Sequence, residues 1–564
     1  MPLIQRRPLD SSLPLIPRIL KSRGLDAAAL EFGLKNLADF SSLKDIGRAV
    51  DLLVTAIRHK KRILIVGDFD ADGATSTALA VHALQKMGAD WVHYLVPNRF
   101  EYGYGLSAAI TQLAFAQYKP DLLITVDNGI ASFEGVALAK QLGMQVLITD
   151  HHLAAEVLPD ADAIVNPNQP GCLFPSKAAC GCAVIFYVMC ALKRRLVDEN
   201  LLTDSALNMA DYLDLVALAS VADVVPLDNN NRILVEQGLR RIRKGFARPG
   251  IMALLKISGK FAERLASKDF GFALGPRLNA AGRMDDMSIG IECLLTNNAH
   301  TADEFARLLD ELNQDRKAVE GVMQQEALRQ LEALRFDENN MPAALCLFNP
   351  DWHQGVVGLL ASRIKERYHR PVIAFAPADN AEIKGSARSI PGFHLRDALD
   401  VVAKRKPHLL SKFGGHAMAA GLSLRSTDFA EFTQAFTQVA SEQITPEQLV
   451  HTVLSDGPLA AHEYTLENAH QLRFCAPWGQ QFPEPVFDDE FFIQSQRLLG
   501  EKHLKMTVKP VNGGPLMDAI AFNVDVKAWP NNQCQRVHLV FEMDANFFRE
   551  QWTLQLMVRD IRAL

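Results

Sequence analysis

Residues 61–80 read KRILIVGDFDADGATSTALA, and this stretch decides how the first half of the chain folds. Its short β-branched apolar run, residues 62–66, is typical of a buried strand, and the Thr- and Ala-rich residues after Gly73 favour a helix. Three carboxylates, Asp68, Asp70 and Asp72, lie between the two. Ligands of open parallel α/β sheets bind at this end of a strand. The stretch therefore predicts a ligand site at the edge of a parallel sheet, with a solvated acidic turn as the alternative.

The D-x-D-x-D-G spacing is also how a calcium-binding EF-hand loop begins. The twelfth position of such a loop carries a bidentate Glu, and here that position is Leu79. The segment before the loop has the pattern of a strand, whereas an EF-hand loop follows a helix. Both features count against calcium.

Four further apolar runs read as strands and alternate with helical stretches. They are WVHYLVP (91–97), DLLITVD (121–127), MQVLITD (144–150) and the weaker DAIVNP (162–167). Strands that alternate with helices form right-handed βαβ units and a mostly parallel sheet. The first domain is therefore expected to be an α/β domain with a parallel sheet.

The 564-residue chain is too long for a single core, so we expect several domains. The interval 232–335 is mainly helical and ends in a long helix from Ala302 to Arg335, with a capping box of Thr301 and Glu304. Short alternating strands near the C-terminus are typical of a small β-barrel. The expected α/β multidomain chain has these segments: N-terminal arm 1–42, parallel-sheet domain 43–231, helical region with a long connecting helix 232–335, smaller α/β domain 336–445, and β-barrel 446–564.

The composition is that of a globular protein, with 48% hydrophobic and 22% charged residues. No apolar run reaches the ~18–20 residues that span a bilayer, and the N-terminus lacks the apolar stretch of a secretory signal, so we expect a cytoplasmic protein and no membrane. The Cys180–Cys182 pair reads as part of a packed helix, which outweighs a zinc interpretation. The net charge of −6 neither favours nor excludes a nucleic-acid partner.

Other acidic or histidine residues occur at the ends of elements in the parallel-sheet domain. Asp127 and the triplet Asp150-His151-His152 each follow a strand run, and Asp223 interrupts an apolar segment. One Asp after a strand is usually a helix cap, but several at one sheet edge are hard to explain by capping. Carboxylates suit Mg²⁺ and Mn²⁺, and imidazole shifts the preference toward Mn²⁺. Two cations ~3.5–4 Å apart promote displacement at phosphorus, so phosphoester hydrolysis is the favoured chemistry.

These motifs resemble a known family. Asp150-His151-His152 is the signature that names the DHH phosphoesterases, and the other acidic motifs match that superfamily in order. More narrowly, the chain resembles the RecJ family of bacterial single-strand-specific 5′→3′ DNA exonucleases over nearly its whole length. The matching segments are VGDFDADGATS (66–76), TVDNGI (125–130), ITDHH (148–152), LVALASVADVVPL (215–227), LGPRLNAAGRM (274–284), WHQGVVGLLASRI (352–364), GSARSI (385–390) and FGGHAMAAGL (413–422).

The resemblance implies a site for two divalent cations, Mn²⁺ or Mg²⁺, in the DHH domain. Its implied metal ligands are Asp68, Asp70, Asp72, Asp127, His151 and Asp223. His152 is implied to act as a charge stabiliser or acid beside the reacting oxygen, and Asp150 and Asp68 complete the implied catalytic set. The smaller α/β domain then corresponds to the DHH-associated domain and the barrel to an OB-type nucleic-acid-binding domain.

The resemblance also implies residues that hold the DNA. They are Arg277, Asn279, Arg283, Arg363, Arg388, Gly414, Gly415, His416 and Lys505. Each arginine has an alternative role in an ion pair between domains. Trp478 is a candidate for base stacking, and a core position is the slightly favoured alternative.

The activity implied by the resemblance is metal-dependent 5′→3′ hydrolysis of single-stranded DNA to 5′-mononucleotides in DNA recombination and repair. A single-strand-binding protein and a repair helicase are the implied partners, and we expect a monomer. Two alternatives stay open: a DHH phosphatase or oligonucleotidase of small phosphoesters, and a non-catalytic replication protein of the same fold. The extra barrel favours a polymeric substrate, and the complete acidic set favours an enzyme.

Overall fold

The computed structural model describes residues 3–102, 105–333, 341–378, 381–500 and 502–564, without the side chains of residues 99 and 100. The chain forms two compact units. The larger unit contains Arg6–Leu312 and Ser455–Leu564, and the smaller contains Met1–Gln5 and Asn313–Leu454. Among the described residues, no helix combines the length and the apolar character that crossing a bilayer requires.

A parallel sheet of five strands forms the centre of the first domain, as predicted. Its strands lie in the order β3-β2-β4-β5-β6, and every neighbouring pair is parallel. The chain reverses its direction of travel across the sheet between β2 and β4, and such a switch point is where ligands of α/β sheets bind. The strands are β2 (Ile63–Gly67), β3 (Val92–Leu95), β4 (Leu122–Val126), β5 (Gln145–Thr149) and β6 (Ala163–Val165).

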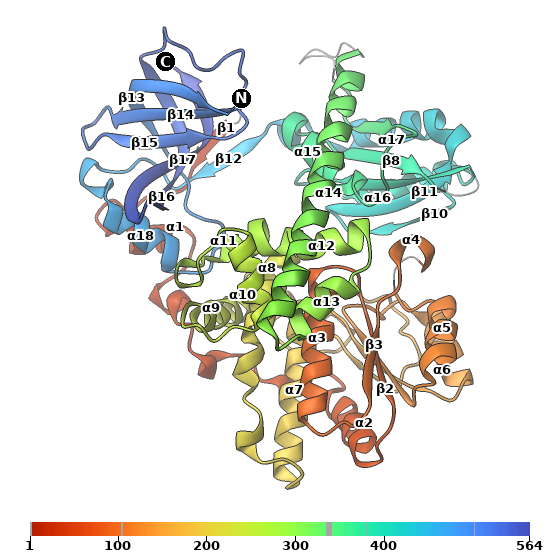
Figure 1. Cartoon of the computed structure of the whole chain (residues 1–564). Helices are drawn as coiled ribbons and strands as arrows, with labels where there is room; N and C mark the ends of the chain where they lie inside the picture. The colour runs from red at the N-terminus through yellow and green to blue at the C-terminus, as the bar shows by residue number, and fades with distance from the viewer. Residues whose placement is uncertain (1–2, 103–104, 334–340, 379–380, 501) are drawn as a thin grey trace. The chain divides into compact units, whose positions relative to one another are not determined.

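Helices cover both faces of this sheet (Figure 1). Ile63 and Ile65 of β2 pack into the core that contains α3 and α7, whereas Leu64 and Val66 pack into the core that contains α5 and α6. A strand buried on both faces needs no polar face, which is why β2 reads as a continuous apolar run. The helices of this domain are α2 (Ile46–Arg58), α3 (Ala71–Lys86), α4 (Arg99–Tyr102), α5 (Ala108–Tyr118), α6 (Phe133–Gln141), α7 (Gly181–Asp198) and α8 (Leu213–Ala222).

The cysteine-rich segment is a packed helix, as predicted. Cys180 and Cys182 are fully buried at the start of α7. No group of metal-ligating side chains within the described ranges includes a cysteine. The zinc interpretation therefore has no support in the fold.

The helical region ends in the long helix that the sequence predicts. It contains α9 (Asn229–Arg243), α10 (Pro249–Ile257), α11 (Ser267–Asp269), a π-helical turn (Phe270–Leu274), α12 (Gly275–Met284), α13 (Ser288–Leu295) and α14 (Ala299–Ala333). The predicted capping box of Thr301 and Glu304 is wrong, because α14 begins at Ala299 and Thr301 already lies in its first turn. The carboxamide oxygen of Asn298 accepts the N–H groups of His300 (2.8 Å) and Thr301 (3.2 Å) instead. The predicted end at Arg335 lies outside the described residues.

The C-terminal segment is a closed barrel with strand order β13-β14-β15-β17-β16, as predicted. Trp478, just before the barrel, is 4% exposed, and its indole N–H donates to the carbonyl oxygen of Leu472 at 2.6 Å. Trp478 is therefore a core residue and not a stacking surface. The N-terminal arm also contributes to the barrel core, through Leu15 and Ile19 of α1. The elements are α1 (Leu15–Ser22), α18 (Leu466–Phe474), β13 (Phe487–Leu499), β14 (His503–Pro510), β15 (Met517–Ala521), β16 (Arg536–Phe548) and β17 (Gln551–Ala563).

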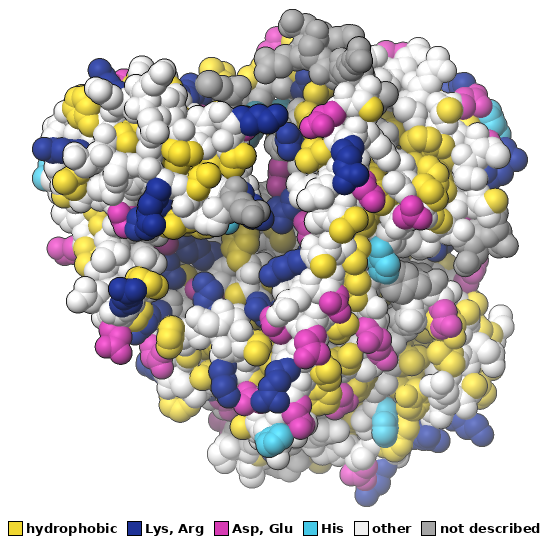
Figure 2. Space-filling view, turned by 45° about the horizontal axis from the view of Figure 1, so that its top comes forward, with side chains coloured by type: hydrophobic (Ala, Val, Ile, Leu, Met, Phe, Trp, Pro, Cys, Tyr) yellow, Lys and Arg dark blue, Asp and Glu magenta, His cyan; other side chains and the backbone are white. Residues whose placement is uncertain are grey.

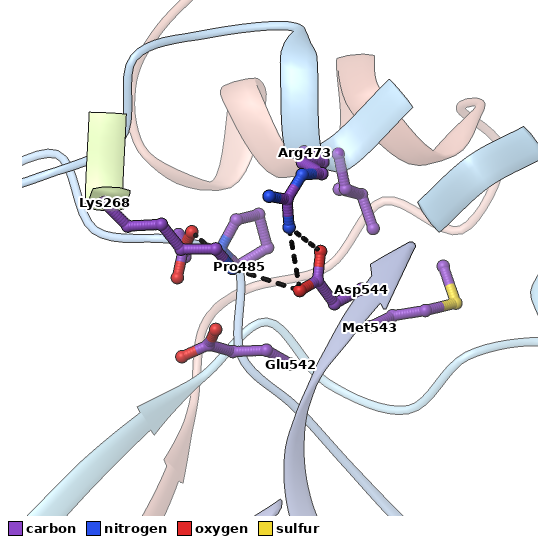
Figure 3. A pocket seen from close by; sticks show the side chains of 8 residues that line it. Lys268, Arg473, Pro485, Glu542, Met543 and Asp544 are labelled. Atoms are coloured by element: carbon purple, nitrogen blue, oxygen red, sulfur yellow. Dashed lines mark hydrogen bonds and ion pairs between the residues drawn. The ribbon is translucent and has the colours of Figure 1, made fainter. Parts of the chain in front are cut away.

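Charged side chains join the barrel to α11 within the larger unit (Figure 3). Lys268 lies 3.2 Å from Asp544 and 3.3 Å from Glu484, and Arg473 lies 2.9 Å from Asp544. Burial raises the pKa of Glu484 to about 8, since Lys268 lowers it by less and Glu542 raises it further. We call these four residues, with Glu542, the barrel seam.

The smaller unit contains a second five-stranded sheet with the order β10-β11-β9-β8-β7. Only its β7–β8 pair is parallel among the described strands, so this domain differs in topology from the first. Its elements are β7 (Leu345–Phe348), α15 (Val357–Tyr368), β8 (Val372–Pro377), β9 (Glu382–Arg388), α16 (Leu395–Arg405), β10 (Lys412–Gly415), β11 (Ala419–Arg425) and α17 (Phe429–Gln443). A short pair, β1 (Leu3–Arg6) and β12 (Thr452–Ser455), lies where the two units meet along the chain. The predicted domain limits stay predictions.

Basic, acidic and apolar side chains are interspersed over the face that Figure 2 shows. The chain as a whole carries a net charge of −6. Overall charge therefore does not identify a binding surface.

Candidate metal centre

The acidic loop after β2 makes a tight turn into α3. Asp70 is the N-cap of α3, and its carboxylate accepts the N–H groups of Asp72 (2.9 Å) and Gly73 (3.0 Å). A side chain at Gly73 has no room, because its Cβ would lie 2.4 Å from the carbonyl oxygen of Asp68. The glycine of the D-x-D-x-D-G spacing thus serves a strand-to-helix turn and not a calcium loop.

Asp72 is buried and binds the start of α7. Its Oδ2 accepts the N–H of Gly181 (2.7 Å), and its Oδ1 accepts the N–H of Cys182 (2.8 Å). Burial and the charge of Asp70 raise the pKa of Asp72 to about 6, although the two N–H groups lower it. Sequence analysis missed Gly181 and Cys182, because a contact across 109 positions leaves no local pattern in a single sequence.

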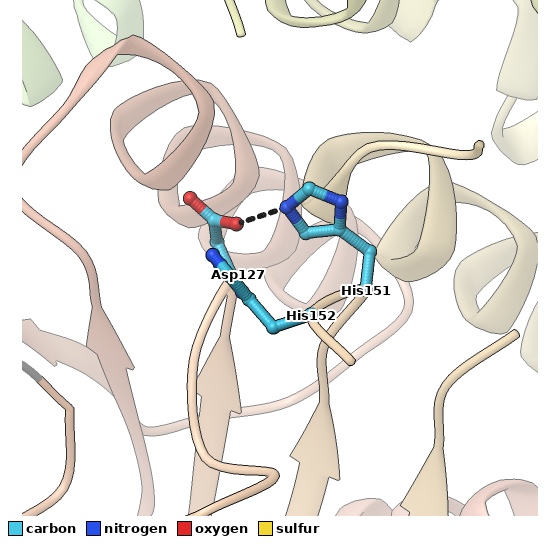
Figure 4. Close-up of side chains that lie close together, drawn as sticks. All are labelled: Asp127, His151 and His152. Carbon is cyan, nitrogen blue, oxygen red and sulfur yellow. Dashed lines mark ion pairs between the residues drawn. The ribbon is translucent and has the colours of Figure 1, made fainter. Parts of the chain in front are cut away.

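Asp127 and His151 follow neighbouring strands, β4 and β5, and their side chains point toward each other (Figure 4). His151 Nε2 lies 3.1 Å from Asp127 Oδ1. The same nitrogen lies 3.6 Å from Asp223 Oδ2, at the end of α8, and 3.8 Å from Asp72 Oδ2. One imidazole nitrogen therefore faces carboxylates from three separate elements.

Burial and mutual repulsion act on these carboxylates together. Burial raises the pKa of Asp127 well above its usual value, and the charge of Asp72 raises it further. The same two effects raise the pKa of Asp223. A positive charge among these oxygens would favour their ionised forms.

Three groups of side chains bring ligand atoms within 4.8 Å of one another. The groups are Asp68-Asp70-Asp127, Asp72-His151-Asp223 and Asp127-His151-His152. Carboxylate oxygens with added imidazole nitrogens suit Mn²⁺ and also Mg²⁺. The residues present therefore fit divalent cations, and all six predicted metal ligands lie in these groups.

Asp150 forms a hydrogen-bonded pair with His152, which belongs to the third of these groups. Asp150 Oδ1 lies 2.7 Å from His152 Nδ1, and Asp150 Oδ2 accepts the N–H of Ile130 at 2.9 Å. Burial lowers the pKa of His152, but the hydrogen bond and charge of Asp150 outweigh it and raise that pKa to about 9. The two histidines thus have different partners: His151 faces several carboxylates, and His152 is bound to Asp150.

The predicted substrate-binding residues on α12 contact the protein itself. Arg277 forms an ion pair with Asp310 at 2.8 Å, which lies within the larger unit and not between domains as its predicted alternative role required. The carboxamide oxygen of Asn279 accepts the N–H of Ala71 at 2.8 Å and so holds the start of α3. Arg283 lies half-buried on the same helix. Helix α12 therefore supports the acidic loop.

Two further predicted residues lie in ion pairs. Arg363 of α15 lies 3.0 Å from Glu320 and 3.5 Å from Glu366. Lys505 of β14 lies 2.7 Å from Asp518 on the neighbouring strand β15. A positive charge that is already paired with a carboxylate of the protein attracts a phosphate less strongly.

Arg388 and the turn Gly414-Gly415-His416 lie beside one strand of the smaller unit. Arg388 is opposite Ala419 of β11, and the N–H of His416 donates to the carbonyl oxygen of Ala419 at 2.8 Å. Burial lowers the pKa of Arg388, whose guanidinium donates to the carbonyl oxygen of the preceding residue at 2.8 Å. This arrangement brings a desolvated arginine and a glycine turn together, which are groups suited to a phosphate.

Family models match three segments of the chain. They are the DHH family, N-terminal domain (residues 62–220), the DHHA1 domain (340–442) and the RecJ OB domain (455–560). The single-stranded-DNA-specific exonuclease RecJ of Salmonella typhimurium is 53% identical over 552 residues, which cover 97% of this chain and 96% of that protein. The protein of the same name from Escherichia coli is 51% identical over 569 residues, which cover 99% of this chain and 98% of that protein.

Solved structures agree with these relatives. The crystal structure of RecJ in complex with Mn²⁺ from Thermus thermophilus has a TM-score of 0.79 at 28% identity and covers 100% of this chain and 80% of that chain. A crystal structure of exonuclease RecJ bound to manganese has a TM-score of 0.60 at 32% identity and covers 72% of this chain and 96% of that chain. The chain belongs to the RecJ family of single-stranded-DNA-specific exonucleases.

Proposed function

We propose that this chain hydrolyses single-stranded DNA from its 5′ end, releases 5′-mononucleotides and acts in DNA recombination and repair. Two divalent cations, Mn²⁺ or Mg²⁺, are the proposed cofactors. One observation carries the proposal: carboxylates and imidazoles that follow β2, β4, β5 and α8 meet at the carboxyl edge of one sheet. RecJ structures that contain Mn²⁺ and Mg²⁺ support this choice of cations.

In this proposal six of the seven residues in the three ligand groups hold the cations, and His152 does not. Asp72 can do so while it binds α7, because its Oδ2 has two lone pairs and accepts only the N–H of Gly181. Bound cations activate the attacking water and neutralise charge on the phosphoryl oxygens. The ligands are Asp68, Asp70, Asp72, Asp127, His151 and Asp223.

His152 is the proposed charge stabiliser or acid beside the reacting phosphate. A pKa of about 9 keeps its ring protonated at neutral pH. In the protonated ring both nitrogens are donors, and Nδ1 pairs with Asp150 Oδ1. The charged ring is the proposed donor to a phosphoryl or leaving oxygen. Asp150 acts through His152 by fixing the direction of the ring.

Arg388 and the turn Gly414-Gly415-His416 are the proposed phosphate-binding group of the smaller unit. The ion pairs of Arg277, Arg363 and Lys505 support a structural role for these three side chains instead. Arg283 remains a proposed contact to DNA, and Asn279 a residue that holds the acidic loop. The single-strand-binding protein, the repair helicase, the monomeric state and the cytoplasmic location are proposed from the resemblance to bacterial relatives alone.

Oligonucleotides labelled at one end or the other test the proposal directly. With Mn²⁺ or Mg²⁺, a 5′ label should appear at once as mononucleotide, whereas a 3′ label should pass through a ladder of shortening products. Asp127→Ala should lower the rate by about 10³-fold or more, because metal-assisted catalysis supplies several kcal/mol of transition-state stabilisation. Asp160→Ala is the matched control, since this aspartate is 92% exposed and pairs only with Lys140 among the described residues.

Other outcomes would support the alternatives. Hydrolysis confined to pyrophosphate or dinucleotides would indicate the small-phosphoester phosphatase. Absence of hydrolysis with either metal would indicate the non-catalytic protein. Mononucleotide release from the 3′ end would contradict the proposed polarity.

A further inference from the structure

Side chains hold all four polar backbone groups of the His151–His152 pair. Asp150 Oδ1 accepts both N–H groups, from His151 at 2.7 Å and from His152 at 3.1 Å. On the carbonyl side, Asn168 Nδ2 donates to the oxygen of His151 at 2.6 Å. Asn166 Nδ2 donates to the oxygen of His152 at 2.9 Å. The pair lies after the end of β5, so these side chains make the backbone hydrogen bonds that neighbouring strands make inside a sheet.

The two asparagines are themselves held in place. Asn166, directly after β6, is fully buried, and its carboxamide oxygen accepts the N–H of Asn168 at 2.7 Å. Asn168 Nδ2 also donates to the carbonyl oxygen of Lys177 at 3.1 Å. Lys177 Nζ closes the loop with bonds to the carbonyl oxygens of Pro167 (2.7 Å) and Cys172 (2.8 Å). The amide donors therefore come from a loop with little freedom to move.

The same segment continues to two other parts of the metal centre. The carbonyl oxygen of Ala178 accepts Asn231 Nδ2 at 2.8 Å, and Asn231 also donates to Pro226 at 2.9 Å, in the loop after Asp223. A few residues later, Gly181 and Cys182 bind Asp72. Residues 166–182 thus touch the backbone of the histidine pair, the loop after Asp223 and the carboxylate of Asp72.

We infer that Asn166 and Asn168 are positioning residues, which set the places of His151 and His152 by holding their peptide groups. The inference rests on the proposed function of the centre. With these two bonds removed, both carbonyl oxygens of the pair lose their asparagine donors, while Asp150 still holds the two N–H groups and the ring of His152. Rotation of either peptide group moves the ring attached to it, and His151 Nε2 must stay within reach of three carboxylates.

An amide is the side chain that this position requires. It donates a hydrogen bond to a carbonyl oxygen without adding charge beside the carboxylate cluster. An aspartate has nearly the same shape but only accepts when ionised, so it would repel the carbonyl oxygen that Asn168 now binds. Asn168→Asp therefore separates the loss of the donor from a change in packing.

The experiment compares Asn168→Ala and Asn168→Asp with Asn468→Ala. Asn468 is a matched control, because it is also half-buried and donates to a backbone carbonyl, that of Glu463, at 2.9 Å, but in α18. Three quantities are measured: kcat and KM on a single-stranded oligonucleotide, Mn²⁺ binding to the DNA-free protein by electron paramagnetic resonance of free Mn²⁺, and the melting temperature.

Loss of partners that orient metal ligands typically costs about 10- to 100-fold in metal affinity or activity. We expect Asn168→Ala and Asn168→Asp to lower kcat and Mn²⁺ affinity by this factor, with KM for DNA changed by less than about 3-fold. Asn468→Ala should lower the melting temperature and leave kcat and Mn²⁺ affinity as in the wild type.

The inference is overturned when both Asn168 variants keep wild-type kcat and Mn²⁺ affinity, whatever their melting temperatures. The test starts from Asn168, because this half-buried side chain tolerates substitution better than the fully buried Asn166. A wild-type protein without activity on single-stranded DNA would refute the proposed function instead. The Mn²⁺-binding measurement would still decide whether the asparagines position the ligands.

Discussion

Replacing Gly181 by alanine should damage the metal centre through a single methyl group. The new Cβ would lie 2.6 Å from Asp127 Cβ, 2.8 Å from its Oδ1 and 2.9 Å from its Cα. Carbon atoms in contact prefer about 3.5–4.0 Å, so Asp127 or the start of α7 has to move by roughly 1 Å. Neither is free to do so without cost, because Asp127 is buried with φ of 62° and the Gly181 N–H binds Asp72.

The expected size of the effect differs between stability and catalysis. Overpacking of this kind costs about 1–3 kcal/mol in the free energy of unfolding. A displacement of about 1 Å at a reacting group costs about 10²-fold in rate. We therefore expect Gly181→Ala to fold, with a melting temperature a few degrees lower, and to lose about 10²-fold in kcat together with Mn²⁺ affinity.

The assay is steady-state hydrolysis of a labelled single strand at saturating Mn²⁺, with calorimetric titration of Mn²⁺ into the DNA-free protein. Gly321→Ala in α14 is the matched control, because a Cβ there meets no atom within 4 Å. Alanine is favoured over glycine inside a helix by about 1 kcal/mol, so this variant should be neutral or more stable. Wild-type kcat and Mn²⁺ affinity in Gly181→Ala would refute the close approach of α7 to Asp127.

Three further predictions test the seam, the arginines and the cations. Burial raises the pKa of Glu484 to about 8, so the folded protein favours the protonated carboxyl group. The stability that this preference contributes is fully present below the usual pKa of 4.5 and is lost as the pH rises from there through 8. The free energy of unfolding of the wild type, measured in urea, should therefore fall by on the order of 2 kcal/mol between pH 6 and pH 9, and that of Glu484→Gln should not. The same dependence on pH in both proteins would contradict this prediction. Arg388→Ala should raise KM for DNA and leave the melting temperature unchanged. Arg277→Ala breaks the pair with Asp310 and should lower the melting temperature more than it changes KM. The opposite result for the two variants would exchange the roles of the two arginines. Because burial and Asp70 raise the pKa of Asp72 to about 6, Mn²⁺ should raise the melting temperature more at pH 8 than at pH 5, and a chelator should abolish the difference.

The fold of the parallel-sheet domain followed from short apolar runs. All five predicted strands exist, and β2 and β4 have the clearest pattern because both are fully buried and contain one polar residue, Thr125. The start of α14 was misplaced by three residues, since Thr301 matched a capping box that Asn298 made unnecessary. Several short polar residues near a helix start can accept the same N–H groups, and a local sequence pattern does not show which of them does so.

The predicted ligands lie together because of topology, which a sequence shows only indirectly. Asp70, Asp127 and His151 each follow a strand, and parallel strands bring their carboxyl ends to one edge. Asn166 and Asn168 were not predicted as functional, because each acts on a backbone carbonyl and leaves no motif of its own. Among the arginines, residue type alone could not separate Arg277, which is paired, from Arg388, whose pKa is shifted by burial alone.

The sequence posed capping and metal binding as alternatives for the acidic residues, and the geometry makes them compatible. Asp70 caps α3, Asp72 caps α7, and Asp150 caps the backbone of the histidine pair. Each N–H bond fixes the direction of the carboxylate, and Asp70 Oδ2 and Asp72 Oδ2 keep lone pairs that the proposed cations would use. Ligands that are fixed by caps do not need to be ordered when the cation binds, so less conformational entropy is lost. Capping is therefore the means by which the proposed centre is preorganised, and an aspartate that caps a helix is compatible with the proposed role as a ligand.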